Sequence, residues 1–511
     1  MNKTKVILEA GNASLSLLRK IAFGPVEVEL RKSDYEAVTR STEAVAQLCA
    51  SDKAIYGVNT GFGKMAQTRI ANNRLTELQH NLLLSHSSGT GPELNDNIVR
   101  LMLTLKVLGL ARGYSGVRRQ VIDALLALIN HEMYPCIPAK GSVGASGDLA
   151  PLAHLSTTLT GVGEMRHQGL TTSATDGLSL AGLSPLTLGP KEGLALINGT
   201  QASTAIALYH FFELEKIFAA AIITGSLSVD AMKGSDAPFD ARLHELRGHQ
   251  GQIDVANIYK TLLSGSEIRA SHINCEKVQD PYSLRCQPQV MGAILDSLRF
   301  AAGILQTEAN AVTDNPLIFD DTGEAISGGN FHAEPVAIAA DLLAIAAAEI
   351  GAITERRIAN LVDPALSLLP AFLVDEPGLN SGFMAAQVTA TALASENKTL
   401  AHPASVDSLP TSANQEDHVS MATFAARKLG DIADNIAGIV AIELLASAQA
   451  IDFHRPWKTS KSLQSAVKKL RKSVPGYSRD RYFSPDIEAA KQIIASRDFS
   501  ENIVEMMPSY A

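Results

Sequence analysis

The sequence predicts a mainly α-helical protein, in which long helices form a bundle and a smaller N-terminal part is mixed α/β. Of its 511 residues 46% are hydrophobic but only 5% are aromatic, so the apolar volume comes from Ala, Leu, Ile and Val. Ala has the highest helix propensity and permits close approach between helices. Long Ala-rich segments occur at 290–312, 336–360 and 419–453. Together these observations favour packed helices over a β-sandwich.

The elements follow from local patterns along the chain. VEVEL alternates as a short strand does, and YGVNTGFG is a loop punctuated by Gly. Helical spacing then begins near residue 98, with Gly113 as a C-cap. The expected order is a strand at 26–30, a loop at 56–63, helices at 98–113, 117–131 and 193–232, and then the three Ala-rich helices. We therefore expect a mixed part at 1–113 and a helical body at 114–511.

Charge and targeting signals narrow the function classes. The net charge is −9, which argues against a nucleic-acid binder because such proteins need a basic surface. The N-terminus lacks a long apolar region, and the most apolar run, 336–353, contains Asp341 and Glu349. Four Cys residues without a CxxC pair indicate reduced thiols. We expect a cytoplasmic protein without a membrane partner.

The usual cofactor and metal motifs do not occur. GFGK at 61–64 is followed by Met65 and lacks the Walker spacing, and no GxGxxG, HExxH or GxSxG is present. The scattered His and Asp residues do not form a metal cluster, so we expect no metal ion.

The unusual segment is 139–156, AKGSVGASGDLAPLAHLS, whose glycines at 141, 144 and 147 surround Ala145-Ser146-Gly147. The simple interpretation is a tight loop before a helix that Asp148 caps. The alternative is chemical. A compressed turn brings the Gly147 nitrogen onto the Ala145 carbonyl carbon, and loss of that oxygen as water closes a five-membered ring. Loss of the Ser146 hydroxyl as a second water leaves an exocyclic methylidene, an electrophile made from the backbone.

This segment resembles the signature of the aromatic amino acid lyases, which carry 4-methylideneimidazol-5-one (MIO) formed from Ala-Ser-Gly. The resemblance continues over nearly the whole chain and is greatest to the histidine-specific members. The motifs that carry it are YGVNTGFG (56–63), LSHSSGTG (84–91), GSVGASGDLAPLAHLS (141–156), NGTQAS (198–203), VQDPYSLRCQPQVMGA (278–293), DNPL (314–317), SGGNFHAEP (327–335) and SVDSLPTSANQEDHVSM (405–421).

The resemblance implies an enzyme that eliminates ammonia from L-histidine to give trans-urocanate, the first step of histidine degradation. It also implies the helical architecture shared by aromatic amino acid lyases and fumarase-like proteins. The MIO would form autocatalytically, with no external cofactor. The enzyme would be a homotetramer whose active sites combine residues of several subunits.

The resemblance assigns a role to each site residue according to its position in one of these motifs. Ala145, Ser146 and Gly147 resemble the MIO precursor in the loop 141–148. The other residues that resemble the site are Tyr56 and His86 of the N-terminal part, Asn198, Gln279, Tyr282, Arg285, Phe331 and Glu416. Tyr56, Tyr282 and Glu416 would be catalytic. Asn198 would bond the MIO, Arg285 would clamp the substrate carboxylate, and Gln279 and Phe331 would line the pocket.

Structural interpretations stand beside these roles. Asn198 fits a helix N-cap, Glu416 a carboxylate in the first turn of a helix, and Arg285 a salt bridge. Two chemical alternatives also stay open. The MIO accepts either the substrate's amine or its ring, and either Tyr282 or Glu416 could be the base that removes the β-proton.

The pair Ser85-His86 indicates the substrate. The resemblance implies a His-Leu pair at these positions in tyrosine-selective relatives and a Phe-Leu pair in phenylalanine-selective ones. In this chain, His86 and Glu416 could hydrogen-bond an imidazole. The alternatives are a tyrosine or phenylalanine lyase, an aminomutase, or a helical scaffold whose Gly-rich loop is only a loop. A fumarase-type lyase is disfavoured because the GSSxMPxK motif is missing.

Overall fold

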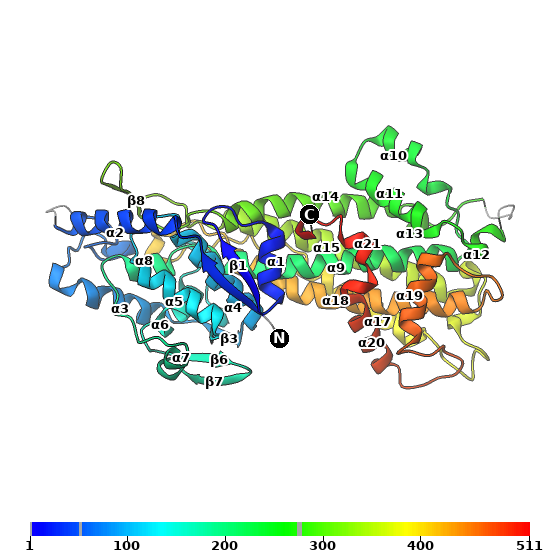
Figure 1. Cartoon of the computed structure of the whole chain (residues 1–511). Coiled ribbons are helices and arrows are strands. Elements are labelled where there is room, and N and C mark those ends of the chain that lie inside the picture. Colours follow the sequence, from blue (N-terminus) through cyan, green and yellow to red (C-terminus); the bar gives the residue numbers. More distant parts are fainter. Residues whose placement is uncertain (1–2, 51–53, 273–277, 511) are drawn as a thin grey trace. The chain divides into compact units, whose positions relative to one another are not determined.

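Helices dominate the chain, as the Ala-rich composition predicts (Figure 1). The computed structural model describes residues 3–50, 54–272 and 278–510. These fall into two compact units, Met1–Tyr209 with Ala302–Asp341 and Pro403–Arg427, and His210–Ala301 with Leu342–His402 and Lys428–Ala511. The expected boundary at residue 113 falls inside the first unit. The division into a mixed part and a helical body therefore stays a prediction.

The first unit contains the strand expected at 26–30. This strand, β2 (Val26–Leu30), pairs in parallel with β1 (Thr4–Leu8), and α1 (Leu15–Phe23) connects them. The unit also contains α2 (Asp34–Ala50), α3 (Leu75–His86), β3 (Thr90–Glu93), α4 (Asp96–Leu110), α5 (Arg119–Asn130), β4 (Tyr134–Pro135), β5 (Pro138–Lys140), α6 (Leu149–Thr158), β6 (Glu164–His167), β7 (Leu170–Ser173), α7 (Ala174–Leu180), α8 (Glu192–Ile197), β8 (Leu317–Phe319) and β9 (Glu324–Ile326).

Two helix boundaries differ from the sequence prediction. Helix α4 ends at Leu110 with Ala111 as its C-cap, and Gly113 lies in the turn that follows, at φ +78°. The helix expected over 193–232 is two helices, α8 and α9 (Gln201–Ala231). Between them Asn198 is extended and Gly199 has φ +130°, because this segment pairs with the loop at 141–148. A glycine in this conformation interrupts the helix that the apolar pattern predicts.

The three Ala-rich segments are long helices, as predicted. They are α14 (Gln287–Ala309), α15 (Glu334–Val362) and α18 (Ala422–Asp452). Four of the five divisions between the units fall within these helices and α9, and the fifth lies between His402 and Pro403, outside any helix. The second unit also contains α10 (Ala241–Arg247), α11 (Gln250–Leu263), α12 (Glu267–Ala270), α13 (Tyr282–Arg285), α16 (Pro364–Ser367), α17 (Met384–Leu400), α19 (Lys461–Arg471), α20 (Ser484–Ala495) and α21 (Glu501–Val504).

Helix α15 is apolar enough to cross a membrane by length and composition, contrary to our expectation for this run. We expected Asp341 and Glu349 to make this run too polar to cross a membrane. The most apolar stretch of the helix nevertheless has a mean hydropathy of 2.0. About two thirds of that stretch, 67%, is buried inside the protein, which is typical of a core helix.

Three of the four cysteines, Cys49, Cys136 and Cys286, have free thiols, as the sequence predicts. The fourth, Cys275, lies outside the described residues.

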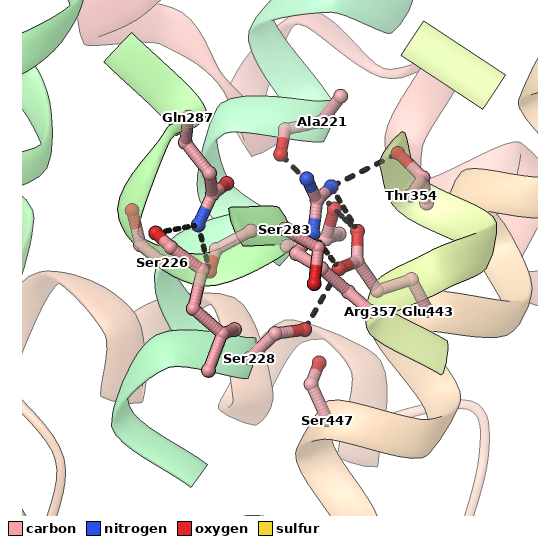
Figure 2. Close-up of polar contacts among 12 residues, drawn as sticks. Ala221, Ser226, Ser228, Ser283, Gln287, Thr354, Arg357, Glu443 and Ser447 are labelled. Atoms are coloured by element: carbon pink, nitrogen blue, oxygen red, sulfur yellow. Dashed lines mark hydrogen bonds and ion pairs between the residues drawn. The ribbon is translucent and has the colours of Figure 1, made fainter. Parts of the chain in front are cut away.

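The core of the second unit contains a buried ion pair (Figure 2). The guanidinium of Arg357 on α15 donates through Nε and Nη2 to the carboxylate of Glu443 on α18, and both side chains have 0% exposure. On α9, Thr224 Oγ1 and Ser228 Oγ donate to the same carboxylate over 2.5 and 2.7 Å. Arg357 Nη2 also donates to Thr354 Oγ1 over 2.9 Å. The pair thus ties three long helices together, and its hydrogen bonds offset part of the cost of removing both charges from water.

We predict that Arg357→Met lowers the free energy of unfolding by about 3–5 kcal/mol, because the Glu443 carboxylate is left buried without its cation. Urea unfolding followed by circular dichroism measures the change. The matched control is Arg242→Met, since this Arg is 85% exposed and pairs with Asp240 at the surface. We expect little change there. Equal midpoints for the two variants would contradict the prediction.

Candidate active site

The Ala145-Ser146-Gly147 tripeptide lies in the loop between β5 and α6, against the segment that joins α8 to α9. Gly147 forms a parallel bridge with Gly199, and the Asp148 amide donates to the Gly199 carbonyl over 2.7 Å. Gly147 has φ +75°, and a Cβ there would lie 2.3 Å from the Gly199 oxygen. Only glycine therefore fits position 147, for both conformational and steric reasons.

Asp148 anchors this loop. Its carboxylate is fully buried and accepts hydrogen bonds from Ser142 Oγ, Thr423 Oγ1, Ser203 N and Ser203 Oγ over 2.7–3.0 Å. It makes no side-chain cap for α6. Asp148 thus occupies the N-cap position of α6, as the simple interpretation expects, but its carboxylate connects the loop to α9 and α18 instead of capping the helix.

Asn198 holds the carbonyl of the central residue. Its Nδ2 donates to the Ser146 oxygen over 2.6 Å, and the side chain is buried. Asn198 is the C-cap residue of α8, so the N-cap interpretation is wrong. Its Oδ1 is buried and accepts no hydrogen bond from the described residues, which leaves an acceptor unfilled.

Lys106 holds the backbone of Asn198 in place by a hydrogen bond to its carbonyl oxygen. This Lys on α4 is buried, and its Nζ donates to the Ala195 and Asn198 carbonyls over 3.2 and 3.0 Å. The negative end of the short helix α8 thus receives an ammonium group. Burial lowers the pKa of Lys106 to about 7, although the charges of Asp314 and Asp148 oppose this effect.

Glu416 contacts the tripeptide from the loop that precedes α18. Ser146 Oγ donates to its Oε1 over 2.5 Å, and Thr411 Oγ1 and Ser412 Oγ donate to its Oε2 over 2.6 and 3.0 Å. Burial alone would raise the pKa of Glu416, but the hydrogen bonds from Ser146, Thr411 and Ser412 outweigh burial and lower it. Because α18 begins only at Ala422, Glu416 is not in its first turn, and that interpretation is wrong.

Tyr56 and His86 also face the site. Tyr56 lies in the loop expected at 56–63, and its hydroxyl accepts from the Gly63 amide over 3.3 Å. His86 ends α3, and its Nδ1 is 2.9 Å from the Leu82 carbonyl. The same Nδ1 lies 3.0 Å from Ser85 Oγ. In the tautomer that donates from Nδ1 to the Leu82 carbonyl, Nε2 is an acceptor.

The tripeptide and several of the residues around it line one cavity of about 1120 Å³ within the first unit. The residues predicted for the site that line it are Tyr56, His86, Ala145, Ser146, Asn198, Phe331 and Glu416. Ser85 lines it as well, and so do His332 and His418, whose rings stack with centroids 5.9 Å apart. The cavity therefore combines a serine hydroxyl, amide donors and acceptors, a carboxylate and imidazoles.

A family model described as aromatic amino acid lyase matches residues 13–472. The chain belongs to the aromatic amino acid lyase family. A histidine ammonia-lyase of Burkholderia pseudomallei (strain 668) is 60% identical over 495 residues, which are 97% of this chain and 98% of that one.

Solved structures of the family share the fold. A histidine ammonia-lyase from Trypanosoma cruzi superposes with a TM-score of 0.91 at 38% identity, covering 99% of this chain and 97% of that chain. A tyrosine aminomutase from Streptomyces globisporus also gives 0.91, at 34% identity, covering 98% of this chain and 99% of that chain. The predicted mainly α-helical fold is thus confirmed.

In this aromatic amino acid lyase, three of the predicted site residues belong to the second unit and do not line the cavity. Gln279 is exposed, and the Tyr282 side chain is 71% exposed. Arg285 Nε donates to the Asp280 carbonyl over 3.0 Å, and its guanidinium lies 4.5 Å from the centre of the Tyr282 ring. The roles that the family resemblance implies for these three residues stay predictions.

Sequence reasoning missed Lys106, His332 and His418. A lone Lys within the apolar run LMLTLKVLGL was a signal for a buried amine, because such a charge needs partners in the core. The two histidines lie within motifs already used, but nothing in their spacing indicated that their rings stack.

We predict that Lys106 makes stability depend on pH. The folded chain releases this proton near pH 7, whereas the unfolded chain keeps it to about the ordinary value of 10.5. Between these values the unfolded state binds more protons, so the free energy of unfolding rises with pH, by up to about 1.4 kcal/mol per unit. In Lys106→Met this contribution is lost. Urea unfolding at pH 7.5 and 9.5 compares the two chains, and equal slopes would contradict the assignment.

Proposed function

We propose that this protein is a histidine ammonia-lyase, which eliminates ammonia from L-histidine to give trans-urocanate, the first step of histidine degradation. The observation that carries the proposal is the position of Ser146, held at a large cavity between Asn198 and Glu416. The 60% identity to a histidine ammonia-lyase over nearly the full length supports the choice of substrate.

The residues around the tripeptide fit an MIO formed from Ala145, Ser146 and Gly147. Gly147 is packed against Gly199 with no space for a Cβ, which favours the compressed turn that cyclisation needs. The Ser146 carbonyl already has a hydrogen-bond donor in Asn198. Once formed, the MIO supplies an electrophile that activates the substrate at its amine or its ring. No external cofactor or metal ion is included in this proposal.

The cavity's own side chains suit an imidazole substrate. The imidazole of His86 and the carboxylate of Glu416 offer hydrogen-bond partners at separate positions around the site. Phe331 supplies an apolar wall of the cavity. Tyr56, which would be the catalytic tyrosine, lines the same cavity. A buried site that hydrogen-bonds a ring nitrogen discriminates strongly against a phenyl ring.

The remaining roles belong to the second unit. Arg285 would hold the substrate carboxylate, Gln279 would line the pocket, and Tyr282 would compete with Glu416 for the role of β-proton base. As the family resemblance implies, we propose a homotetramer in which neighbouring subunits complete each active site. We place the enzyme in the cytoplasm, with no nucleic-acid or membrane partner.

We predict that the intact purified chain is two waters lighter than its sequence. Ser146→Ala is expected to abolish activity and, because alanine has no hydroxyl to lose, to be at most one water lighter than its own sequence. Intact-mass spectrometry and urocanate absorbance with L-histidine measure both effects. Cinnamate or a β-amino acid from phenylalanine or tyrosine, without urocanate from histidine, would instead favour another lyase or an aminomutase. A full-mass chain that is active would exclude the MIO.

Shared active sites predict complementation. Ser146→Ala and Arg285→Ala are each expected to lose nearly all activity, because one lacks the electrophile and the other the carboxylate clamp. Coexpression of the two variants in one cell forms mixed tetramers, in which some sites combine an intact Ser146 with an intact Arg285. We expect part of the activity to return, and the control is a mixture of the separately purified variants. No recovery in verified mixed tetramers would contradict shared sites.

A further inference from the structure

The side chains of Asn198 and Glu416 form hydrogen bonds with two different atoms of Ser146. Asn198 Nδ2 lies 2.6 Å from its carbonyl oxygen, and Glu416 Oε1 lies 2.5 Å from its hydroxyl oxygen. Among the described residues, no other group is hydrogen-bonded to Ser146 Oγ. The two partners therefore touch the two atoms at which charge develops when a serine loses water.

Glu416 has the properties of a base at this position. The hydrogen bonds from Ser146, Thr411 and Ser412 outweigh its burial and lower its pKa, so the group is a carboxylate at neutral pH. Thr411 and Ser412 bind Oε2, which leaves Oε1 directed at Ser146. The backbone of Glu416 also pairs with that of Thr411, which holds the carboxylate in place.

Asp148, the other carboxylate of this region, is not available for proton transfer. Both of its oxygens accept hydrogen bonds, from Ser142 and Thr423 on one oxygen and from Ser203 on the other. It lies in the core and anchors the loop, whereas Glu416 lines the cavity, where water can leave.

We propose that Glu416 is the proton carrier that dehydrates Ser146, with Asn198 stabilising the charge that develops on the Ser146 carbonyl oxygen. Glu416 takes the Cα proton of Ser146, and the electron pair of that C–H bond becomes the Cα=Cβ double bond. The Cβ–Oγ bond breaks with its electrons on oxygen, which takes the proton back from Glu416 and leaves as water. The carboxylate is regenerated, and no other reactant is consumed.

Hydrogen bonding explains why both partners are needed. Removal of the Cα proton places negative charge on the neighbouring carbonyl oxygen, and a fixed donor at 2.6 Å stabilises that charge. The leaving hydroxyl needs a proton, and an acid already in contact with it delivers one without rearrangement. The inference rests on the proposed function, because it concerns how the MIO precursor loses its second water.

The test uses the full-length chain and does not depend on catalytic activity. Intact mass is measured for the wild type and for Glu416→Gln, and peptide mapping locates the lost water. A small thiol then reports the dehydrated side chain, because it adds to the Cβ of residue 146 only after the hydroxyl has left. We expect the wild type to be two waters lighter and more than half of the Glu416→Gln chains to retain the Ser146 hydroxyl. We also expect Glu416→Asp to mature to an extent between these two.

Matched variants separate proton transfer from a general loss of structure. Glu27→Gln makes the same change at a carboxylate that is 42% exposed at the surface, so this variant is expected to lose both waters. Circular dichroism and the urea midpoint show whether each variant is folded, and a folded Glu416→Asp chain replaces Glu416→Gln if the latter fails to fold. A folded Glu416 variant that loses both waters as completely as the wild type overturns the inference. A wild-type chain of full mass overturns the proposed function instead.

Discussion

The contact between the backbones of Gly147 and Gly199 is the constraint on which the site depends. Two chain segments meet there with no side chain between them, and Ser146 is fixed beside the contact. Its carbonyl then meets Asn198, the residue before Gly199, and its hydroxyl meets Glu416 from a third segment. A Cβ at Gly147 would lie 2.3 Å from the Gly199 oxygen and push the two segments apart, which would disturb both contacts.

Buried charges maintain this contact. Asp148 ties the tripeptide loop to α9 and α18, and Lys106 fixes the carbonyls at the end of α8. Neither group is expected to contribute much net stability, because burying a charge costs nearly as much as its hydrogen bonds return. What these groups supply is a defined position for Asn198 and Ser146. Buried charges have a similar role in the second unit, where the ion pair of Arg357 and Glu443 connects long helices.

Much of this organisation could be predicted from the sequence. Ala-rich composition predicts the long helices, because their propensity and packing are local properties. The motif resemblance indicates most of the residues that line the cavity. The break at Asn198 could not be predicted, since the apolar pattern continues through it and a distant loop causes it. The same holds for Asp148, whose position before α6 suggests a cap although its partners lie on other helices. Tyr282 and Arg285 show the other limit, because the contacts described for them within the second unit do not reveal the roles that the resemblance implies.

The hydrogen bond between Ser146 and Glu416 has a consequence for the unprocessed chain. While the serine keeps its hydroxyl, that hydroxyl occupies one acceptor oxygen of the carboxylate, as a ligand's N–H group would. A newly folded chain thus carries an internal competitor inside its own cavity. Loss of the hydroxyl removes this competitor and exposes the acceptor in a single event. Under the proposed function, a chain that keeps the hydroxyl therefore lacks both the electrophile and an unobstructed binding position.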